Sequence, residues 1–548
     1  MRSITRGRTI RPLLGIAAAA ALLAACSGAP APDGSSTSAP TSGFTVDTPK
    51  PTKDAGDVVW AAYHEVQTLD PIYAFDLPEA AGLSAMCDSL LRMNNDMSYG
   101  NGLGTMTQPS DTEYDFAINA GAKFWDGSAV TADDVVFSLE RQRDKTLGGF
   151  YGAVFDRVKT IEAVDASTVK ITLTQPDYWL PGELSSTPGK IIQKKFATAA
   201  GQAYGTPSGG IMCSGVMKLE SWQTGAGVKM VPNTAYWDSS LPKPKLTTLT
   251  LTGVPDDAAL TAGLETGAID GSYLFALSTL GRLQSSDSVK VFQGAPFQSN
   301  SMAIMATQGP LADPKVRQAV SLAIDRKGLL ATLLRGAGNL PHAMVGSGTW
   351  GTAQDVFKAG YDALPALEQD VAKAKELAKT LGIEGKTVRV GTSTGIPSAS
   401  TTALAFKAAC EAIGLKVELV DSSPTNFVNF FIDPKAIASI DAVPTANYGD
   451  YADPSALYKT IVLPGGSQNY TGYDNPAVTS ALNAARSEKD ETKRAQDVVT
   501  AQKVITDELV WIPLLVPNNV LVMNKGITGA PATFVYAYGP WPAYLGGA

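Results

Sequence analysis

Strand-like and helix-like patterns alternate along the chain from about residue 58 onward. Short apolar or alternating runs predict strands, and apolar residues that recur every three or four positions predict helices. We expect strands at 58–62, 113–119, 158–164, 168–174, 387–390 and 417–420, and helices at 80–93, 131–143, 315–334, 366–381 and 400–413. The sequence shows no internal repeat, and this alternation predicts an α/β fold.

The first 25 residues have the pattern of an export signal. Four arginines (Arg2, Arg6, Arg8 and Arg11) precede an apolar stretch from Leu13 to Ala25 that is short for a membrane span. The stretch ends in Leu-Ala-Ala followed by Cys26, which resembles a bacterial lipobox, where the cysteine thiol accepts a diacylglycerol. We expect residues 1–25 to be removed and acyl chains on Cys26, palmitate among them, to hold the protein on the extracytoplasmic face of the cell membrane. The alternative is an ordinary signal peptide followed by a chance cysteine.

Composition adds two expectations. Ser, Thr, Pro, Gly and Ala dominate residues 26–56, which predicts a disordered tether ahead of a fold that begins near Val58. The formal charge of −8 becomes −12 without the four arginines of the signal, so nucleic acid is not an expected partner. No later segment is apolar enough to cross a membrane, so the protein is expected to lie on the membrane.

The chain has four cysteines. If Cys26 carries lipid, Cys87, Cys213 and Cys410 remain, and one intramolecular disulfide at most can form. Cys410 lies on the apolar side of the helix predicted at 400–413 and is expected to be a buried thiol. Cys87 and Cys213 both flank predicted loops, and the sequence leaves open whether they are bonded to each other.

Seven motif-like segments follow one another along the chain. They are EVQTLDP (65–71), FAINAGAKFWDGSAVTADDVVFSLER (116–141), VPNTAYWD (231–238), LETGAID (264–270), DPKVRQAVSLAIDRKGL (313–329), NYGDYADPSALY (447–458) and YTGYDNPAV (470–478). In order and spacing they resemble the blocks of peptide-type (family 5) extracellular solute-binding proteins, and the similarity covers about residues 57–548. Two features depart from the family pattern: residues 93–113 lack its usual E-x-W, and Gly215-Val216 stands where Gly-Pro is usual.

The resemblance implies a two-lobed, periplasmic-binding-protein-like fold (type II, cluster C) with a subdomain appended to one lobe. Carried over to this chain, residues 57–78, 206–298 and 505–548 would form lobe I, residues 79–205 the subdomain, and residues 299–504 lobe II. The implied function is to capture a small solute, expected to be a di- or oligopeptide, between closing lobes and to deliver it to the permease subunits of an ABC importer. No catalysis and no cofactor are implied, and we expect a monomer.

The resemblance also implies a ligand-binding aspartate. In peptide-binding members an aspartate of the block matching NYGDYADPS pairs with the ligand's amino group, which makes Asp450 the candidate. A buried ammonium group needs such a partner, because an unpaired buried charge costs several kcal/mol. The other expected ligand-binding residues are Asn447, Tyr448 and Tyr451, which would line the pocket, and Phe75, Asp76 and Leu77, which would offer backbone groups to an extended ligand. The alternative for Asp450 is a solvated loop carboxylate.

Two further residues near these segments have simpler interpretations. Asp453, before Pro454, is expected to cap the next helix. His342 lies in a predicted loop and could approach the cleft, although a lone loop histidine is more often a surface residue. No arginine stands out as the partner of a ligand carboxylate.

Other ligands and other roles stay open. An oligosaccharide would need aromatic platforms, for which Trp222, Trp350 and Trp511 are candidates, and a chelated metal would be carried by the same fold. A third interpretation is a lipoprotein that serves only as an adhesin or sensor. A cleft too filled to admit a ligand would favour it.

Motifs that indicate enzymes are incomplete. Residues 391–395 match the G-x-S-x-G elbow of serine hydrolases, but His64 and His342 both precede Ser393, so no downstream histidine can act as the base. Residues 346–351 match G-x-G-x-x-G without a preceding strand, which does not favour a dinucleotide site. Two histidines and no clustered cysteines predict no metal site built by the protein itself.

Overall fold

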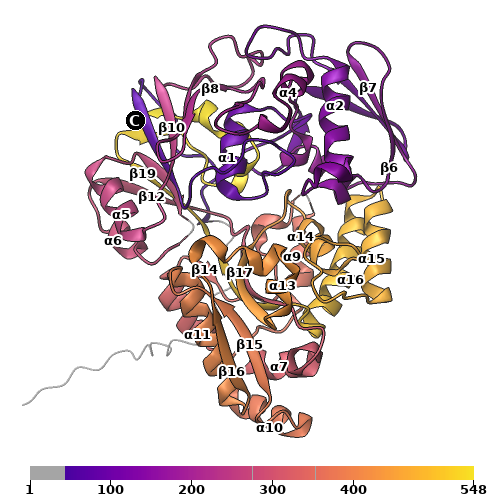
Figure 1. Ribbon diagram of the computed structural model, residues 1–548, viewed down its shortest axis with the longest axis vertical. Coiled ribbons are helices and arrows are strands. Elements are labelled where there is room, and N and C mark those ends of the chain that lie inside the picture. The colour runs from indigo at the N-terminus through magenta and orange to yellow at the C-terminus, as the bar shows by residue number, and fades with distance from the viewer. Residues whose placement is uncertain (1–42, 275, 352) are drawn as a thin grey trace, which may run out of the picture. The chain divides into compact units, whose positions relative to one another are not determined.

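The computed structural model describes residues 43–274, 276–351 and 353–548; the predicted signal peptide and Cys26 lie outside these ranges. Figure 1 shows two large sheets with helices on their faces. The sheet of the first lobe has the order β12 (Val289–Gly294), β19 (Asn519–Asn524), β11 (Gly271–Leu274), β1 (Asp57–Ala62), β10 (Thr248–Gly253), β9 (Gly227–Pro232), β8 (Met217–Gln223). The sheet of the second lobe has the order β14 (Gly338–Asn339), β18 (Ile512–Pro517), β13 (Ser299–Ile304), β17 (Ala442–Asn447), β15 (Thr387–Thr392), β16 (Lys416–Asp421). The predicted α/β class is confirmed.

The chain passes between the two sheets through two short connections. It leaves β12 at Gly294 and enters β13 at Ser299, and it returns from β18 to β19 through Asn518 alone. The Asn518 side-chain amide donates to Gln293 Oε1 at 2.7 Å, so the two connections are tied to each other. Two short, adjacent crossings are the usual structure of a hinge between two lobes.

The second lobe is longer at its C-terminal end than predicted. The expected return to the first lobe at residue 505 is wrong, because β18 pairs with β13 and β14 in the second sheet and the return comes at Asn518. The pattern of apolar residues did not reveal this, since β18 and β19 are both apolar and a single residue separates them.

A four-stranded antiparallel sheet marks the appended subdomain. Its order is β4 (Gly104–Ser110), β5 (Glu113–Ile118), β7 (Thr168–Leu173), β6 (Val158–Ala163), and it packs against α2 (Ala132–Arg143) around an apolar core of its own. Thr131 accepts a hydrogen bond from the Asp134 N–H, while the Asp134 carboxylate accepts one from the Thr131 N–H. This reciprocal cap fixes the start of α2 where the sequence predicted it.

Two predicted helices are shorter than their apolar patterns indicated. Helix α1 (Leu77–Met86) ends at Cys87, whose backbone is extended, and residues 91–93 form β2 (Leu91–Met93). The helix predicted at 315–334 is interrupted after α7 (Pro314–Ala323), because the Asp325 side chain caps a new helix, α8 (Arg326–Leu329). Buried apolar residues continue past both ends, so their periodicity did not show where the helices end.

Residues 43–56 do not form the disordered tether that was predicted for them. The Thr45 N–H donates to the Gln293 carbonyl, Thr48 Oγ1 donates to the Ala530 carbonyl, and Lys53 pairs with Gly547 in a β-bridge. These bonds hold the segment against the first lobe. The rest of the predicted tether lies outside the described residues, and within them no helix has the length and apolarity that a membrane crossing requires.

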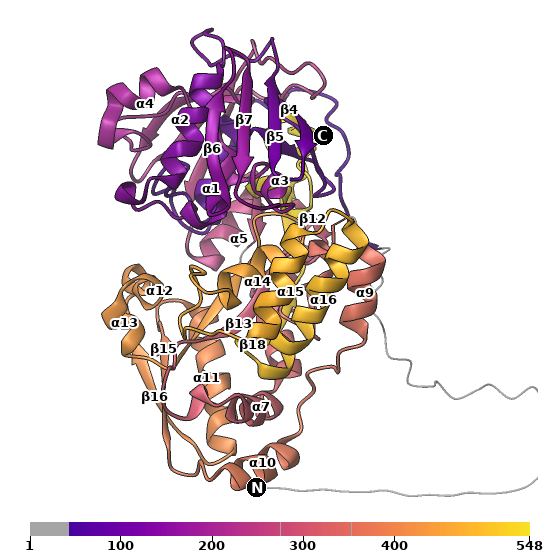
Figure 2. The same ribbon diagram turned by 90° about the vertical axis from the view of Figure 1, so that its right-hand side faces the viewer.

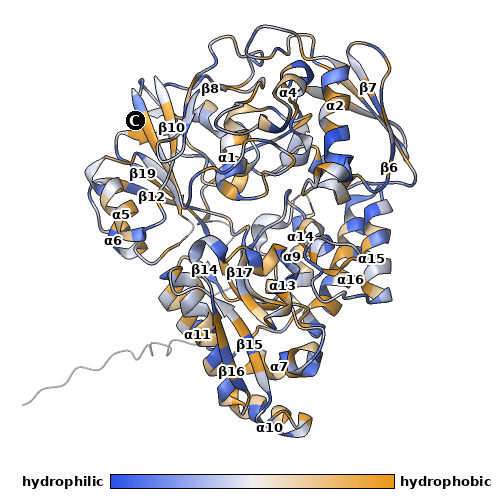
Figure 3. Ribbon diagram, viewed as in Figure 1, coloured by the Kyte–Doolittle hydropathy of each residue, from blue (hydrophilic) through white to orange (hydrophobic). Residues whose placement is uncertain are grey.

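Helix α1 lies within the first lobe and places the candidate site. The expected start of the subdomain at residue 79 is therefore wrong, because the apolar residues of α1 belong to the first-lobe core and the subdomain core begins at Leu90. All residues of α1 are buried, and the helix packs against the C-terminal turns η10 (Phe534–Ala537) and η11 (Trp541–Tyr544). Figure 3 shows hydrophobic residues along strands such as β15, and hydrophilic patches along α2 and along α15 (Pro476–Ser487). Because α1 is fixed in the core, its first turn, with Asp76 as the N-cap and Glu79, is held in place.

A disulfide joins Cys87, at the end of α1, to Cys213, ahead of β8, and Cys410 is a buried free thiol. The bond thus links two segments of the first lobe on either side of the subdomain. We expect the Cys87→Ser, Cys213→Ser double variant to lose roughly 2–4 kcal/mol of unfolding free energy, because the unfolded chain is no longer constrained by so long a loop. Denaturant unfolding with and without a reductant measures this.

The control for this prediction is Cys410→Ala, which keeps the disulfide and should keep its full sensitivity to the reductant. Reduced wild-type protein should match the double variant. An equal effect of the reductant on the double variant would contradict the prediction.

Candidate functional site

The loop that follows β17 touches the first lobe at two places. Tyr448 Oη donates a hydrogen bond of 3.1 Å to the Phe75 carbonyl. Tyr538 Oη, from the C-terminal segment of the first lobe, donates to the Gly449 carbonyl at 3.0 Å and to Asp450 Oδ1 at 3.3 Å. Residues 448–450 therefore lie at the boundary between the lobes, where a solute held by both would be found.

Asp450 is a carboxylate without a cationic partner at this boundary. No described Lys, Arg or His forms a salt bridge with it, and its hydrogen bond comes from the neutral Tyr538 hydroxyl. Burial raises the pKa of Asp450 to about 6, and the bond from Tyr538 offsets part of that rise. A carboxylate in this state is the partner that a ligand cation needs, because each compensates the other's loss of hydration.

The structure separates the other predicted residues into two groups. Tyr448, Phe75 and Asp76 lie together at the boundary with Asp450. Asn447 donates its amide to Gln468 Oε1 at 2.6 Å, and the Tyr451 ring packs against Gly182. Leu77 is buried at the start of α1 and borders a small cavity. Asn447 is therefore engaged within the second lobe, whereas Tyr451 contacts Gly182 of the subdomain across the boundary; their places in a pocket lining stay predictions.

Sequence reasoning missed a group of tyrosines around these carboxylates. Tyr63 donates a short hydrogen bond to Asp76, and Tyr538 donates to Asp450. Burial raises the pKa of Tyr151 well above its usual value, and the nearby charges of Asp450 and Asp76 raise it further. The aromatic-rich C-terminal sequence around Tyr536 and Tyr538 was the available signal, but it was assigned only to the first lobe.

A cavity of about 20 Å³ lies on the first-lobe side of this boundary. Its lining includes Tyr63, Leu77, Tyr273, Gln298 and Tyr536. This volume suits a water molecule. A solute of several residues is larger than this cavity.

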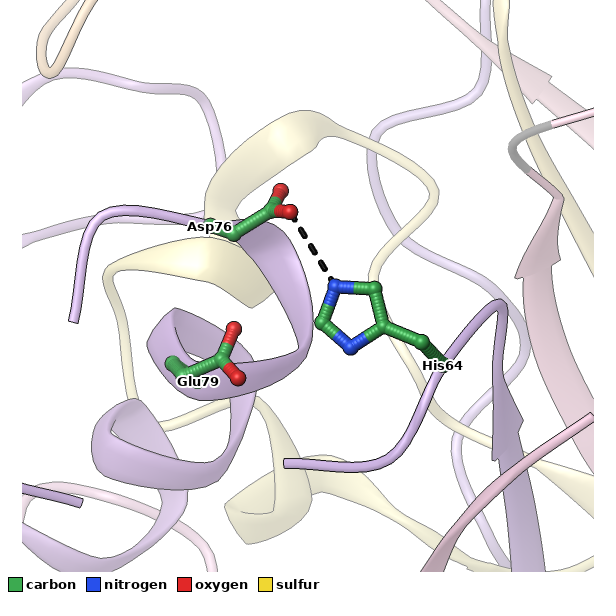
Figure 4. Close-up of side chains that lie close together, drawn as sticks. All are labelled: His64, Asp76 and Glu79. Atoms are coloured by element: carbon green, nitrogen blue, oxygen red, sulfur yellow. Dashed lines mark hydrogen bonds and ion pairs between the residues drawn. The ribbon is translucent and has the colours of Figure 1, made fainter. Parts of the chain in front are cut away.

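Three side chains with metal-ligating atoms meet beside Tyr63 (Figure 4). His64 Nε2 lies 3.1 Å from Asp76 Oδ2, and one atom each of His64, Asp76 and Glu79 lies within 4.8 Å of the others. Burial lowers the pKa of His64, but the bond to Asp76 and the charges of both carboxylates raise it overall, to about 9. Burial raises the pKa of Glu79 to about 7 against the opposing charge of His64. The prediction of no metal site considered histidine and cysteine spacing and overlooked two carboxylates beside one histidine.

A second set of polar contacts joins the subdomain to the second lobe. Arg486, on α15, donates to Asp177 Oδ2 at 2.5 Å and to Asp156 Oδ1 at 2.6 Å. Lys459 forms an ion pair with the buried Glu183, and Arg157 donates to Asn483 Oδ1 at 3.0 Å. Figure 2 shows α15 next to the four-stranded sheet of the subdomain. The two lobes are therefore in contact on this side as well as at residues 448–450.

The residues on which the other interpretations of the sequence depend are buried or bonded within the fold. The exposed fractions of Trp222, Trp350 and Trp511 are 8%, 6% and 3%, so none of these rings offers an open face. Ser393 is fully buried, and its hydroxyl has no hydrogen-bond partner among the described residues. His342 bonds to the Leu364 carbonyl at 2.7 Å and its ring lies 4.9 Å from the Tyr361 ring in a tilted arrangement, which anchors the His342 loop within the second lobe.

The family model of the bacterial extracellular solute-binding proteins, family 5 Middle, matches residues 105–469. The chain belongs to this family.

Known periplasmic binding proteins are similar to this chain over most of their length. The probable D,D-dipeptide-binding periplasmic protein DdpA of Escherichia coli is 26% identical over 482 residues, which are 84% of this chain and 89% of that protein. The periplasmic murein peptide-binding protein MppA of E. coli is 26% identical over 494 residues, with 85% and 89% covered. The structure of the periplasmic binding protein DppA from Helicobacter pylori in complex with the peptide STSA matches with a TM-score of 0.79 at 20% identity, covering 90% of this chain and 99% of that one.

The family 5 motifs largely hold the scaffold together in this structure. Arg141, at the end of the longest motif, binds Asp70 of the first motif through two hydrogen bonds of 2.9 and 2.7 Å. Tyr236 and Trp237 both donate to the buried Asp88 at 2.9 Å. These interactions connect the subdomain to the first lobe and explain why the motifs identify the fold better than they identify the ligand.

Proposed function

We propose that this family 5 protein captures a di- or oligopeptide between its two lobes and presents it to the permease subunits of an ABC importer. The observation that carries the proposal is Asp450, a carboxylate at the boundary of the lobes with a tyrosine hydroxyl as its partner. The ammonium group of a peptide would supply the cationic partner that Asp450 lacks. Relatives that bind peptides by name, such as MppA and the H. pylori protein, support the peptide as the solute.

Closure of the lobes would follow if the solute contacts both of them. A solute favours the closed arrangement only if it binds that arrangement more tightly, which requires contacts with both lobes. Asp450 and Tyr448 belong to the second lobe, and Phe75, Asp76 and Tyr538 belong to the first. The two crossings at residues 294–299 and 517–519 are the expected hinge.

The tryptophans argue against an oligosaccharide. A sugar ring is expected to stack on an open aromatic face, and the three candidate tryptophans are buried in the core. The tyrosines that do line the boundary bring hydroxyl groups close to carboxylates, which suits a polar, cationic solute.

The lipid anchor is part of the proposal. The basic N-terminus, the apolar stretch and Cys26 support attachment of the protein to the extracytoplasmic face of the cell membrane. Such a tethered, monomeric protein would stay near its permease.

Native mass spectrometry of the purified protein, followed by denaturing release of any bound solute, tests the proposal. We expect a released mass that fragments as a peptide with a free amino terminus. Release of a sugar, or calorimetric titration with a mixed dipeptide and tetrapeptide library that gives no heat, would contradict the peptide assignment.

A further inference from the structure

A cluster on the first-lobe wall of the boundary has the composition of a metal site. We propose that His64, Asp76 and Glu79 form a binding site for a divalent transition-metal ion, for which Zn²⁺ is the probe. The cluster is separate from Asp450, and the proposal holds whether or not the captured solute is a peptide. One imidazole nitrogen and two carboxylate oxygens are suitable ligands for Zn²⁺ and related ions.

In each of the three side chains, the polar atom that does not face the cluster forms a hydrogen bond with a neighbouring residue. His64 Nδ1 lies 2.7 Å from the Glu65 carbonyl, to which it donates, so that Nε2 is the nitrogen that faces Asp76 and Glu79 (Figure 4). Metal-bound histidines usually have this arrangement, in which a bond at one ring nitrogen orients the other toward the ion.

The two carboxylates follow the same scheme. Asp76 Oδ1 accepts from the Leu77 N–H at 2.8 Å and from the Tyr63 hydroxyl, and Glu79 Oε1 accepts from the Gln67 N–H at 2.7 Å. Asp76 Oδ2 and Glu79 Oε2 are then the oxygens that remain to face His64. All three ligands are therefore oriented by outer hydrogen bonds before any ion arrives.

The Glu79 carboxylate provides the observation that points to a cation at this site. The residue is 3% exposed, and its Oε2 atom has no hydrogen-bond partner among the described residues. A buried carboxylate oxygen without a partner is costly. With a neutral imidazole the cluster carries two negative charges, which a divalent cation would balance.

The distances allow coordination after small side-chain movements. Ligand atoms around a tetrahedral zinc ion, at about 2.1 Å from it, are about 3.4 Å apart. His64 Nε2 and Asp76 Oδ2 are already 3.1 Å apart, and the whole group lies within 4.8 Å. Because Asp76 and Glu79 lie at the start of the buried helix α1, the remaining gap would be closed by movement of the side chains and not of the backbone.

Three protein ligands leave a position open. His64 and Asp76 have side chains that are about one-third exposed, at 33% and 35%, and Phe75 next to them is bonded to Tyr448 of the second lobe. The open position can therefore be filled by water or by a donor atom of the captured solute. This gives the first-lobe wall a cationic group opposite the anionic Asp450.

The test uses the mature protein after treatment with a chelator and buffer exchange. Zn²⁺ is titrated by calorimetry at about pH 8 in buffers of different ionisation heat, because binding of the ion displaces the proton that His64 holds at this pH. Glu79→Gln keeps the shape of the side chain and removes a ligand, and His64→Gln removes the nitrogen. His342→Gln is the matched control, because it changes the chain's other histidine, which lies in the second lobe. Thermal unfolding of the metal-free variants shows that each is folded.

We expect one Zn²⁺ per chain in the wild type and in His342→Gln, and an affinity at least about tenfold weaker in both Glu79→Gln and His64→Gln. No stoichiometric binding to the wild type, an equal loss in His342→Gln, or full affinity in Glu79→Gln would overturn the proposal. If His64→Gln does not fold, the near-isosteric Glu79→Gln variant decides. Peptide binding by metal-free wild type, measured in parallel, reports on the proposed function independently.

Discussion

Asp450→Asn weakens the binding of peptides with a free amino terminus by roughly 2–5 kcal/mol, the range measured when one partner of a buried charge pair is removed. Asparagine has nearly the same shape and can still accept the hydrogen bond from Tyr538, so the charge is the main thing that changes. Isothermal titration with one peptide and its N-acetylated form measures the effect. The acetylated peptide should bind both proteins with similar, weak affinity.

The matched control is Asp453→Asn, three residues further along the same loop. Asp453 caps α14 (Pro454–Val462) by accepting the Ser455 N–H, a role that asparagine fills equally well. Its peptide affinity should stay within a factor of a few of the wild type. Equal affinities of Asp450→Asn and the wild type would remove Asp450 from the site.

The same carboxylate predicts opposite effects of pH on binding and on stability. Because burial raises the pKa of Asp450 to about 6, peptide affinity should fall about tenfold between pH 7 and pH 5 as Asp450 takes up a proton. Without ligand, the folded form binds this proton more tightly than the unfolded chain does. The contribution of Asp450 to the unfolding free energy therefore rises by up to about 3 kcal/mol as the pH falls from above 6 toward 4. The difference between wild type and Asp450→Asn at each pH isolates this contribution.

Arg486→Met destabilises the closed arrangement of the lobes by roughly 3–5 kcal/mol. The variant keeps the length of the side chain but leaves Asp177, which is 1% exposed, without its cationic partner. A buried charge that has lost its partner carries the full cost of its lost hydration. Opening of the lobes would rehydrate Asp177, so we expect a larger radius of gyration in solution scattering and a weaker apparent solute affinity.

The control for Arg486 is Lys503→Ala on α16 (Glu491–Glu508). Lys503 forms an exposed ion pair with Asp507 on the same helix, which contributes little. Its radius of gyration and solute affinity should match those of the wild type. A compact Arg486→Met protein with unchanged affinity would show that this contact does not control closure.

The sequence predicted the fold well where local chemistry defines an element. Thr131 with Asp134 gave the start of α2, and Asp165-Ala166-Ser167 gave the hairpin of β6 and β7. It failed where long-range contacts decide. The end of α1 at Cys87 coincides with a disulfide to a residue 126 positions away, and the place of β18 depends on β13 and β14, which lie far earlier in the chain.

The candidate site was predicted in part for the same reason. Asp450 and Tyr448 lie in a motif, so the resemblance pointed to them. Tyr538 and Glu79 lie in segments without a motif, and the fold alone brings them to the boundary. Asn447 shares the motif with Asp450 but bonds to Gln468 within the second lobe, and Tyr451 packs against Gly182 of the subdomain, because proximity in sequence does not specify the direction of a side chain.

The placement of β18 and β19 also bears on how the chain matures. Each of these strands lies in the interior of its sheet, β18 between β14 and β13 and β19 between β12 and β11. Neither sheet can close until residues 512–524 have left the ribosome. Both lobes are therefore expected to complete their sheets only near the end of synthesis, whereas the four-stranded sheet of the subdomain, whose strands all lie within residues 104–173, can form earlier.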